Sequence, residues 1–410
     1  MAAKRKYPVG IQSFSDIRSK GFLYVDKTEL IYKMITEGKP YFLSRPRRFG
    51  KSLLVSTLAA VFEGRRELFE EMTLKDGTVQ PRLFIATTDL EWERHPVLRF
   101  DFSAGDLDTI EQLDKLINAT LADYERRFGI TPVDQDTNLR MINLIRTAHE
   151  QTGQQVVVLC DEYDSMMLHS IGDPVKQRAV RQRFQNLFGP LKSEDEHLRL
   201  VFITGISKFS QMGVFSRLNQ MRNISMDPAY DALCGISESE LTTTLRPDIE
   251  QMAECSGVGY DKMLALLKQN YDGYHFSSGM TDIYNPFSLF SAFSSGLLSD
   301  YWFSSGTTRA LIDMLTQMPR IDLTSVSHVE CDSSAFDRPF DTFSAPLPVL
   351  YQSGYLTIKD YDREIDAFTL GLPNNEVQRG FAASLYASIT HSDDCDDPER
   401  NGLKVVPTSC

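Results

Sequence analysis

The sequence contains no apolar run that approaches the ~18 residues needed to span a lipid bilayer. Basic residues near the N-terminus are not followed by an apolar stretch, so the pattern of a secretory signal is missing. The six cysteines form no CxxC pair, which argues against a disulfide framework or a zinc site. These absences predict a cytoplasmic protein that does not enter a membrane.

An excess of positive charge is also lacking. Acidic residues outnumber basic residues by 56 to 43, which gives a net charge of −13 at pH 7. A global electrostatic attraction to nucleic acid or to an anionic membrane is therefore not expected, although a local basic patch would still allow nucleic-acid binding. The composition is globular, and 410 residues exceed the ~250–300 that one hydrophobic core supports, so we expect more than one domain.

Short apolar segments alternate with helical patterns in the first half of the chain. Helical patterns lie at about 51–63, 110–127, 137–151 and 174–192. The apolar segments are 41–44, 97–102, 156–160 and 198–204. This alternation predicts an α/β fold, in which helices cover both faces of a parallel sheet. The segment 156–160 is apolar throughout, as expected of a central strand.

The pattern changes after about residue 228. Helices are expected over 237–254, 259–270, 286–297 and 307–318. From about residue 345, a helix, a glycine turn and a strand with a partner at 368–373 indicate a small winged-helix-like α+β module. The predicted units are an α/β domain over 1–228, a helical region over 229–340, this module over 341–390 and a disordered acidic tail over 391–410.

The most specific motif, residues 44–52, lies between the first strand and the following helix and ends in Gly-Lys-Ser. In a phosphate-binding loop (Walker A), backbone N–H groups surround the phosphates, a lysine reaches the β- and γ-phosphates, and a serine binds Mg²⁺. Gly50, Lys51 and Ser52 occupy these positions, whereas Arg45 stands where the first glycine of the usual motif is expected. The alternative is a basic surface turn with solvated arginines.

Two acids, Asp161 and Glu162, follow the buried strand at 156–160, as in a Walker B motif. Mg²⁺ is bound through few carboxylates and substrate phosphates, so Asp161 is expected to bind a magnesium-bound water. Glu162 is expected to polarise the water that attacks the γ-phosphate. An ordinary strand that ends in a polar turn is the alternative. Because the phosphate loop calls for such an acid, the two motifs together predict a nucleotide bound with Mg²⁺.

A third polar strand end is expected on a strand that lies between these two. Thr204 and Ser207 are candidates to hydrogen-bond the γ-phosphate or the attacking water, and a strand cap is the alternative. The predicted catalytic residues are thus Glu162, Thr204 and Ser207, and the predicted metal ligands are Ser52 and Asp161. The residues expected to contact the nucleotide are Arg47, Arg48, Phe49, Gly50, Lys51, Ser52, Leu53 and Asp161. Transition-state charge could be stabilised by Arg47, Arg48, Arg217 or Arg222.

Ten segments together resemble a bacterial AAA-ATPase-like family, a divergent branch of the P-loop ATPases. These segments are 7–12, 24–28, 45–52, 160–164, 204–209, 234–236, 271–274, 284–286, 301–302 and 352–356. In this family Arg-Pro-Arg-Arg precedes Gly-Lys-Ser, so the missing first glycine is normal for it. Many members continue into a domain similar to PD-(D/E)XK nucleases, and since this chain ends before such a domain would fit, nuclease activity is not expected.

The resemblance implies a P-loop ATPase domain over 1–228, with a five-stranded parallel sheet in P-loop order. It implies ATP and Mg²⁺ as cofactors, and Tyr24 or Val25 as candidates to lie against the adenine; the alternative there is a helix start capped by Asp26. The expected function is Mg²⁺-dependent ATP hydrolysis that is coupled to a conformational signal for an unknown protein partner. The alternatives are a nucleotide-gated binding module with negligible turnover and a nucleic-acid-processing protein.

Overall fold

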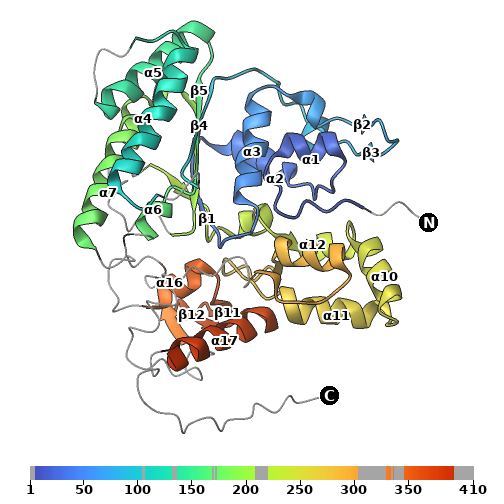
Figure 1. Cartoon of the computed structure of the whole chain (residues 1–410). Coiled ribbons are helices and arrows are strands. Elements are labelled where there is room, and N and C mark those ends of the chain that lie inside the picture. Colours follow the sequence, from blue (N-terminus) through green and yellow to red (C-terminus); the bar gives the residue numbers. More distant parts are fainter. Residues whose placement is uncertain are drawn as a thin grey trace.

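At the centre of the fold lies a five-stranded parallel sheet with the strand order β4-β5-β6-β1-β7 (Figure 1). The computed structural model describes residues 5–103, 107–131, 136–168, 170, 173–207, 220–302, 329–333, 336 and 346–391. The strands of the sheet are β1 (Pro40–Ser44), β4 (Val97–Asp101), β5 (Val156–Asp161), β6 (Leu198–Gly205) and β7 (Arg222–Asn223). The predicted parallel α/β sheet is confirmed, and β6 lies between β1 and β5, as expected for the third polar strand end.

Helices cover both faces of this sheet because the strand residues point alternately into two cores. On β5, Val157 and Leu159 belong to one core, whereas Val156, Val158 and Cys160 belong to the other. The first core is covered by α1 (Phe14–Lys20), α2 (Thr28–Glu37) and α3 (Lys51–Phe62), and the second by α4 (Ile110–Arg127), α5 (Thr137–Thr152) and α7 (Pro174–Phe188) (Figure 1). Both faces of β5 are therefore buried.

The helices of the second layer begin at residues that satisfy free backbone N–H groups. Thr109 and Gln112 form a capping box at the start of α4, and Asp136 accepts hydrogen bonds from the first turn of α5. Asp173 caps α7, and Pro174 follows at its first position. These local signals explain why the predicted and observed helix starts agree within a few residues.

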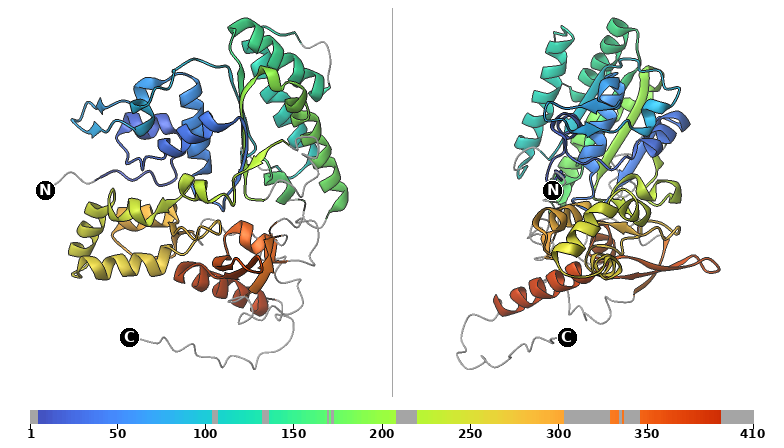
Figure 2. Two further views of the ribbon diagram at one scale, coloured as in Figure 1. Left: turned by 180° about the vertical axis from the view of Figure 1, so that it is seen from behind. Right: turned by 90° about the vertical axis from the view of Figure 1, so that its right-hand side faces the viewer.

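Two further regions lie on the same side of the α/β domain, as both views of Figure 2 show. The helical region contains α9 (Glu238–Thr242), α10 (Arg246–Cys255), α11 (Tyr260–Tyr271) and α12 (Pro286–Ser295), which surround a third core. The C-terminal module contains α16 (Pro346–Ser353), α17 (Asn375–His391) and an antiparallel sheet of β10 (Val329–Asp332), β12 (Ala367–Gly371) and β11 (Thr357–Asp362). The predicted helix, glycine turn and strand pair of this module are present.

The remaining short elements connect these layers. They are η1 (Arg66–Leu68), η2 (Phe84–Thr87), α6 (Ser165–Leu168), α8 (Pro190–Ser193), η3 (Asp195–His197) and η5 (Pro228–Leu233), with the strand pairs β2 (Met72–Thr73) and β3 (Val79–Gln80), and β8 (Ile236–Ser237) and β9 (Ile283–Tyr284). None of the helices in these described ranges combines the length and the apolar character that crossing a bilayer requires. The predicted helix at 307–318, Arg217 and the acidic tail from residue 392 lie outside the described residues.

The first core continues without a break from α3 into the C-terminal module. Leu54 and Leu58 of α3 belong to the same cluster as Trp302, Tyr355 and Leu356. The cluster contains residues on both sides of the predicted domain boundaries near residues 228 and 340. These boundaries therefore stay predictions from the sequence.

A buried ion pair joins α4 to α5 and gives the fold a measurable test. The Arg140 guanidinium donates two hydrogen bonds to the Glu125 carboxylate, at 2.8 and 2.7 Å, and both side chains are less than 8% exposed. Arg140→Met would leave the Glu125 charge buried without its partner, so we expect the free energy of unfolding to fall by about 3–5 kcal/mol in urea denaturation.

Arg126→Met is the matched control on α4. Arg126 pairs with Asp123 at 2.8 Å, but both side chains are more than 70% exposed, so the expected change is about 1 kcal/mol or less. Equal losses in the two variants would contradict the assigned importance of burial.

Candidate functional site

The loop that joins β1 to α3 presents a helix N-terminus to a cavity. Gly50, at the N-cap of α3, has a φ of 91° and no side chain that could cap the helix. Arg48 also has a left-handed backbone, with a φ of 69°, which is uncommon for a residue with a Cβ atom. The first N–H groups of α3 are therefore left for an external acceptor, and the helix dipole favours an anion there.

A cavity of about 510 Å³ lies in front of this loop, a size typical of small-molecule sites. Its walls come from the loop, the start of α3, the end of β5, the N-terminal segment and α12. The lining residues are Pro8, Val9, Gly10, Ile11, Gln12, Arg47, Arg48, Gly50, Lys51, Ser52, Leu53, Ser103, Glu162, Ser165, Pro286, Phe287 and Phe290. Six of the eight nucleotide-contacting residues predicted from the sequence thus line the cavity, together with Glu162.

Lys51 is buried at the base of the loop. Its ammonium group donates hydrogen bonds to the backbone carbonyls of Arg45 and Pro46, both at 3.0 Å. The lysine therefore closes the loop on itself and keeps its charge beside the N-terminus of α3.

Asp161 lies at the end of β5, close to Lys51 and Ser52. Burial raises the pKa of Asp161 to about 6, while a hydrogen bond with the Ser52 side chain and the charge of Lys51 act in the opposite direction. The Oδ1 atom of Asp161 is buried and has no hydrogen-bond partner. A buried acceptor of this kind is the sort of atom that a cation or its bound water satisfies, so Ser52 and Asp161 fit a magnesium ion.

Glu162 follows directly and adopts a left-handed backbone, with a φ of 48°. A non-glycine residue in this region is strained, and such strain is often found at functional sites. The turn takes Glu162 out of the alternation of β5 and makes it part of the cavity wall. The two acids predicted from the sequence thus differ in position: Asp161 is buried behind Ser52, and Glu162 lines the cavity.

Thr204 and Ser207 lie at the expected strand end, but their hydroxyl groups bond within the protein. Thr204 donates to the carbonyl oxygen of Leu43 at 2.7 Å, and Ser207 donates to the Asp164 carboxylate at 2.5 Å. Both are buried, and neither is among the residues that line the cavity. Their predicted contact with the γ-phosphate or the attacking water therefore stays a prediction.

The arginines around the loop have different positions. Arg45, at the place of the missing glycine, is buried and donates to the carbonyls of Ser225 (2.7 Å) and Tyr230 (3.2 Å). Arg47 and Arg48 line the cavity, and the Arg48 guanidinium lies 4.8 Å from the centre of the Phe287 ring.

Arg222 lies on the edge strand β7, where it pairs with Glu37 at 3.2 Å and with Asp227 at 2.9 Å. Of the four arginine candidates, only Arg47 and Arg48 are thus placed at the cavity, since Arg217 lies outside the described residues.

The sequence interpretation missed two walls of the cavity. One is the segment Pro8–Gln12, in which Gly10 has a φ of 76°, and the other is the start of α12 with Pro286, Phe287 and Phe290. The segments 7–12 and 284–286 carried the family resemblance but were given no role. Because both segments are far from the phosphate loop in the sequence, no local pattern predicted that they line the cavity.

A smaller apolar cavity of about 70 Å³ adjoins the first and shares Pro8, Gly50, Leu53, Pro286 and Phe290 with it. Its other lining residues include Tyr24, Val25, Phe49, Leu54 and Ile236. Phe49 therefore contributes to this second cavity and not to the larger one. Lys27 is the N-cap of α2, and Asp26, one residue earlier, accepts from the backbone N–H of Thr28 at 2.8 Å.

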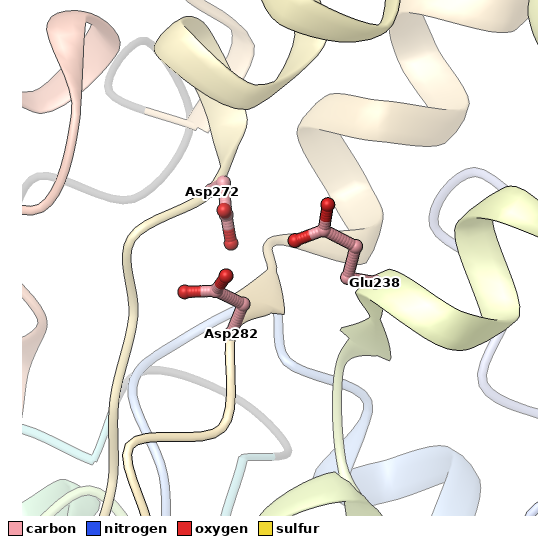
Figure 3. Close-up of side chains that lie close together, drawn as sticks. All are labelled: Glu238, Asp272 and Asp282. Carbon is pink, nitrogen blue, oxygen red and sulfur yellow. The ribbon is translucent and has the colours of Figure 1, made fainter.

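An acidic cluster in the helical region lies apart from this cavity. Glu238, Asp272 and Asp282 bring one carboxylate oxygen each to within 4.8 Å of the others (Figure 3). The Lys268 ammonium lies 2.7 Å from Glu238, 2.9 Å from Asp282 and 3.6 Å from Asp272, and His275 contacts Asp282 at 2.8 Å. Lys268 thus supplies the positive charge that a metal ion would otherwise provide, and we assign no metal to the cluster.

Burial raises the pKa of Asp272 to about 6, so the ionised cluster depends on Lys268. We expect Lys268→Ala to lower the free energy of unfolding at pH 8 by about 1 kcal/mol, because Glu238 and Asp282 lose a charged donor and Asp272 loses a nearby positive charge, at a site that solvent partly screens. Lys262→Ala, at an exposed position of the same helix, is the control and should change stability little. Chemical denaturation of both variants measures the difference, and equal stabilities would show that Lys268 does not balance the cluster.

The chain is similar to a known protein family and to a bacterial protein. The sequence pattern of the family described as "Predicted AAA-ATPase" matches residues 8–215, which include the phosphate loop and both acids. An "Uncharacterized protein in vnfD 5'region" of Azotobacter chroococcum mcd 1 is 35% identical over 390 residues. That alignment covers 93% of this chain and 70% of the relative.

Proposed function

The chain belongs to the Predicted AAA-ATPase family, and we propose that it binds ATP with Mg²⁺ in the 510 Å³ cavity and hydrolyses it. The observation that carries this proposal is the buried, unpartnered Oδ1 of Asp161, which lies beside Ser52 and Lys51 at the uncapped start of α3. A cation and an anion are both called for at one place, and a magnesium nucleotide supplies both.

Each group has a defined task in this proposal. The N–H groups at the start of α3 and the Lys51 ammonium bind phosphate oxygens, in place of the loop carbonyls that Lys51 contacts now. Ser52 and Asp161 hold the magnesium ion, which neutralises charge that develops on the phosphates. Glu162, on the cavity wall, orients a water molecule and accepts its proton.

The smaller apolar cavity supports an adenine site next to the phosphates. It continues from the larger cavity past Gly50 and Leu53, and Tyr24 and Val25 line it. Its walls are largely apolar, as expected for a flat heterocyclic base. In the same segment the Asp26 carboxylate accepts from the first N–H group of α2, so a contact with adenine and a role at the helix start are compatible.

Lys51→Ala tests nucleotide binding. We expect the affinity for a non-hydrolysable ATP analogue with Mg²⁺ to fall at least about tenfold, since a buried charge-assisted contact is lost. Titration calorimetry measures the affinity. Lys20→Ala, at an exposed lysine of α1, should bind like the wild type. An affinity that is unchanged in Lys51→Ala would contradict the proposed site.

Glu162→Gln tests hydrolysis separately from binding. The amide cannot take the proton from the attacking water, so phosphate release should fall about a hundredfold or more, while the affinity for the analogue stays within a few-fold. Glu150→Gln, at an exposed position of α5, is the control. Equal rates in the wild type and Glu162→Gln would remove the hydrolytic step. Binding without measurable turnover in the wild type would favour the nucleotide-gated binding module.

A further inference from the structure

Trp302 connects the back of the phosphate loop to the C-terminal module. Its side chain is 1% exposed, and its indole Nε1–H donates a hydrogen bond to the carbonyl oxygen of Arg47 at 3.0 Å. The backbone N–H of Trp302 donates to Glu376, in the first turn of α17, at 2.6 Å. The other carboxylate oxygen of Glu376 accepts from the Ser288 hydroxyl of α12 at 2.8 Å. One residue therefore bridges the loop and α17.

A second contact between the loop and the module lies beside the first. Gly354, in the turn between α16 and β11, has a φ of 89° and packs against Pro46. A Cβ atom at Gly354 would lie 2.7 Å from the Cβ of Pro46 and 3.5 Å from the Trp302 ring. The ring of Tyr355 also meets the Trp302 ring edge-on, with 5.4 Å between the centroids. Pro46 and Arg47 are thus both contacted by one surface, which Trp302 and Gly354 form.

This support matters because the loop lacks a flexible residue that is usual in such motifs. Arg45 stands at the first glycine position, and Arg48 holds a left-handed backbone, which persists only where the surroundings support it. A peptide carbonyl and the following N–H point in opposite directions. A hydrogen bond that fixes the Arg47 carbonyl from behind therefore keeps the Arg48 N–H directed toward the opposite side of the loop.

We propose that Trp302 is a positioning residue for the phosphate loop, and that through it the nucleotide and the C-terminal module (β10, α16, β11, β12 and α17) stabilise each other. This inference rests on the proposed nucleotide site. If packing of the module against the loop raises the affinity for the nucleotide, then a bound nucleotide favours that packing by the same equilibrium factor. The conformational signal expected from the sequence would then pass from Arg47 through Trp302 to Glu376.

The two tryptophans of the chain provide a direct test. Trp92→Phe leaves Trp302 as the one fluorescent indole, whereas Trp302→Phe leaves Trp92, which packs against Phe69 and does not line the cavity. We expect the non-hydrolysable ATP analogue with Mg²⁺ to change the emission of Trp92→Phe, with a midpoint that matches the calorimetric affinity. The emission of Trp302→Phe should not change.

Affinity gives the second readout. Trp302→Phe keeps an aromatic ring but loses the N–H donor, so a smaller fraction of molecules holds the competent loop, and the analogue should bind about threefold to tenfold more weakly. Trp92→Phe should bind like the wild type. Suppose that both variants bind the analogue with equal affinity and that the Trp302 emission of Trp92→Phe does not change. This result would overturn the coupling but not the nucleotide site. A wild type that shows no calorimetric binding would overturn the nucleotide site itself and the coupling with it.

A glycine pair tests the second contact without changing Trp302. Gly354→Ala and Gly257→Ala both place a Cβ atom at a left-handed backbone, with φ values of 89° and 66°. The new atom meets Pro46 in the first variant and has nothing within 4 Å in the second. We expect Gly354→Ala to bind the analogue at least about threefold more weakly than Gly257→Ala, although both lose stability. Equal affinities would overturn the support of the loop by the module.

Discussion

Asp161 carries a carboxylate to a place that water hardly reaches, at the end of the central strand β5. Burial opposes its ionisation, and the nearby Lys51 and Ser52 only partly compensate. The rest of the site is arranged around this imbalance. The parallel sheet brings the ends of β1 and β5 to the same edge, and the loop after β1 returns its lysine to that edge. A dication bound with a polyanion satisfies the charge requirements of the acid and of the uncapped helix together.

Much of this arrangement could be predicted from the sequence. Strand β5 is a continuous apolar run before its final acid, and β4 and β6 are largely apolar apart from Arg99 and Arg199. The loop motif and the acid pair are recognised by their local spacing. The rest depends on contacts between distant segments. The strand β7 has two residues and no apolar pattern, so its existence follows from pairing with β1. The cavity walls at Pro8–Gln12 and at the start of α12 come from the N-terminal segment and from the helical region, which are far apart in the sequence, and no spacing rule connects them.

The roles of Thr204 and Ser207, at the end of β6, depend on the directions of their side chains, which the sequence does not predict. Both faces of β6 are buried, so the alternation that separates inner from outer positions on a half-exposed strand gives no information there. In the structure the Thr204 hydroxyl donates a hydrogen bond to the backbone of β1, and the Ser207 hydroxyl donates one to the Asp164 carboxylate. Arg45 is a similar case, because its replacement of a glycine makes sense only once the carbonyls of Ser225 and Tyr230 are seen around its guanidinium.

The core shared by α3 and the C-terminal module has a consequence for how the chain loses its structure. Leu58 on one side and Leu356 on the other belong to one apolar cluster, so removing either part takes away members of a shared core. A shortened chain that ended near residue 228 would expose, to water and to other copies of itself, the apolar residues of the cluster that the missing part had covered. Melting should accordingly involve the α/β domain and the module as one cooperative unit, and a protease that cuts between them would yield fragments that stay associated.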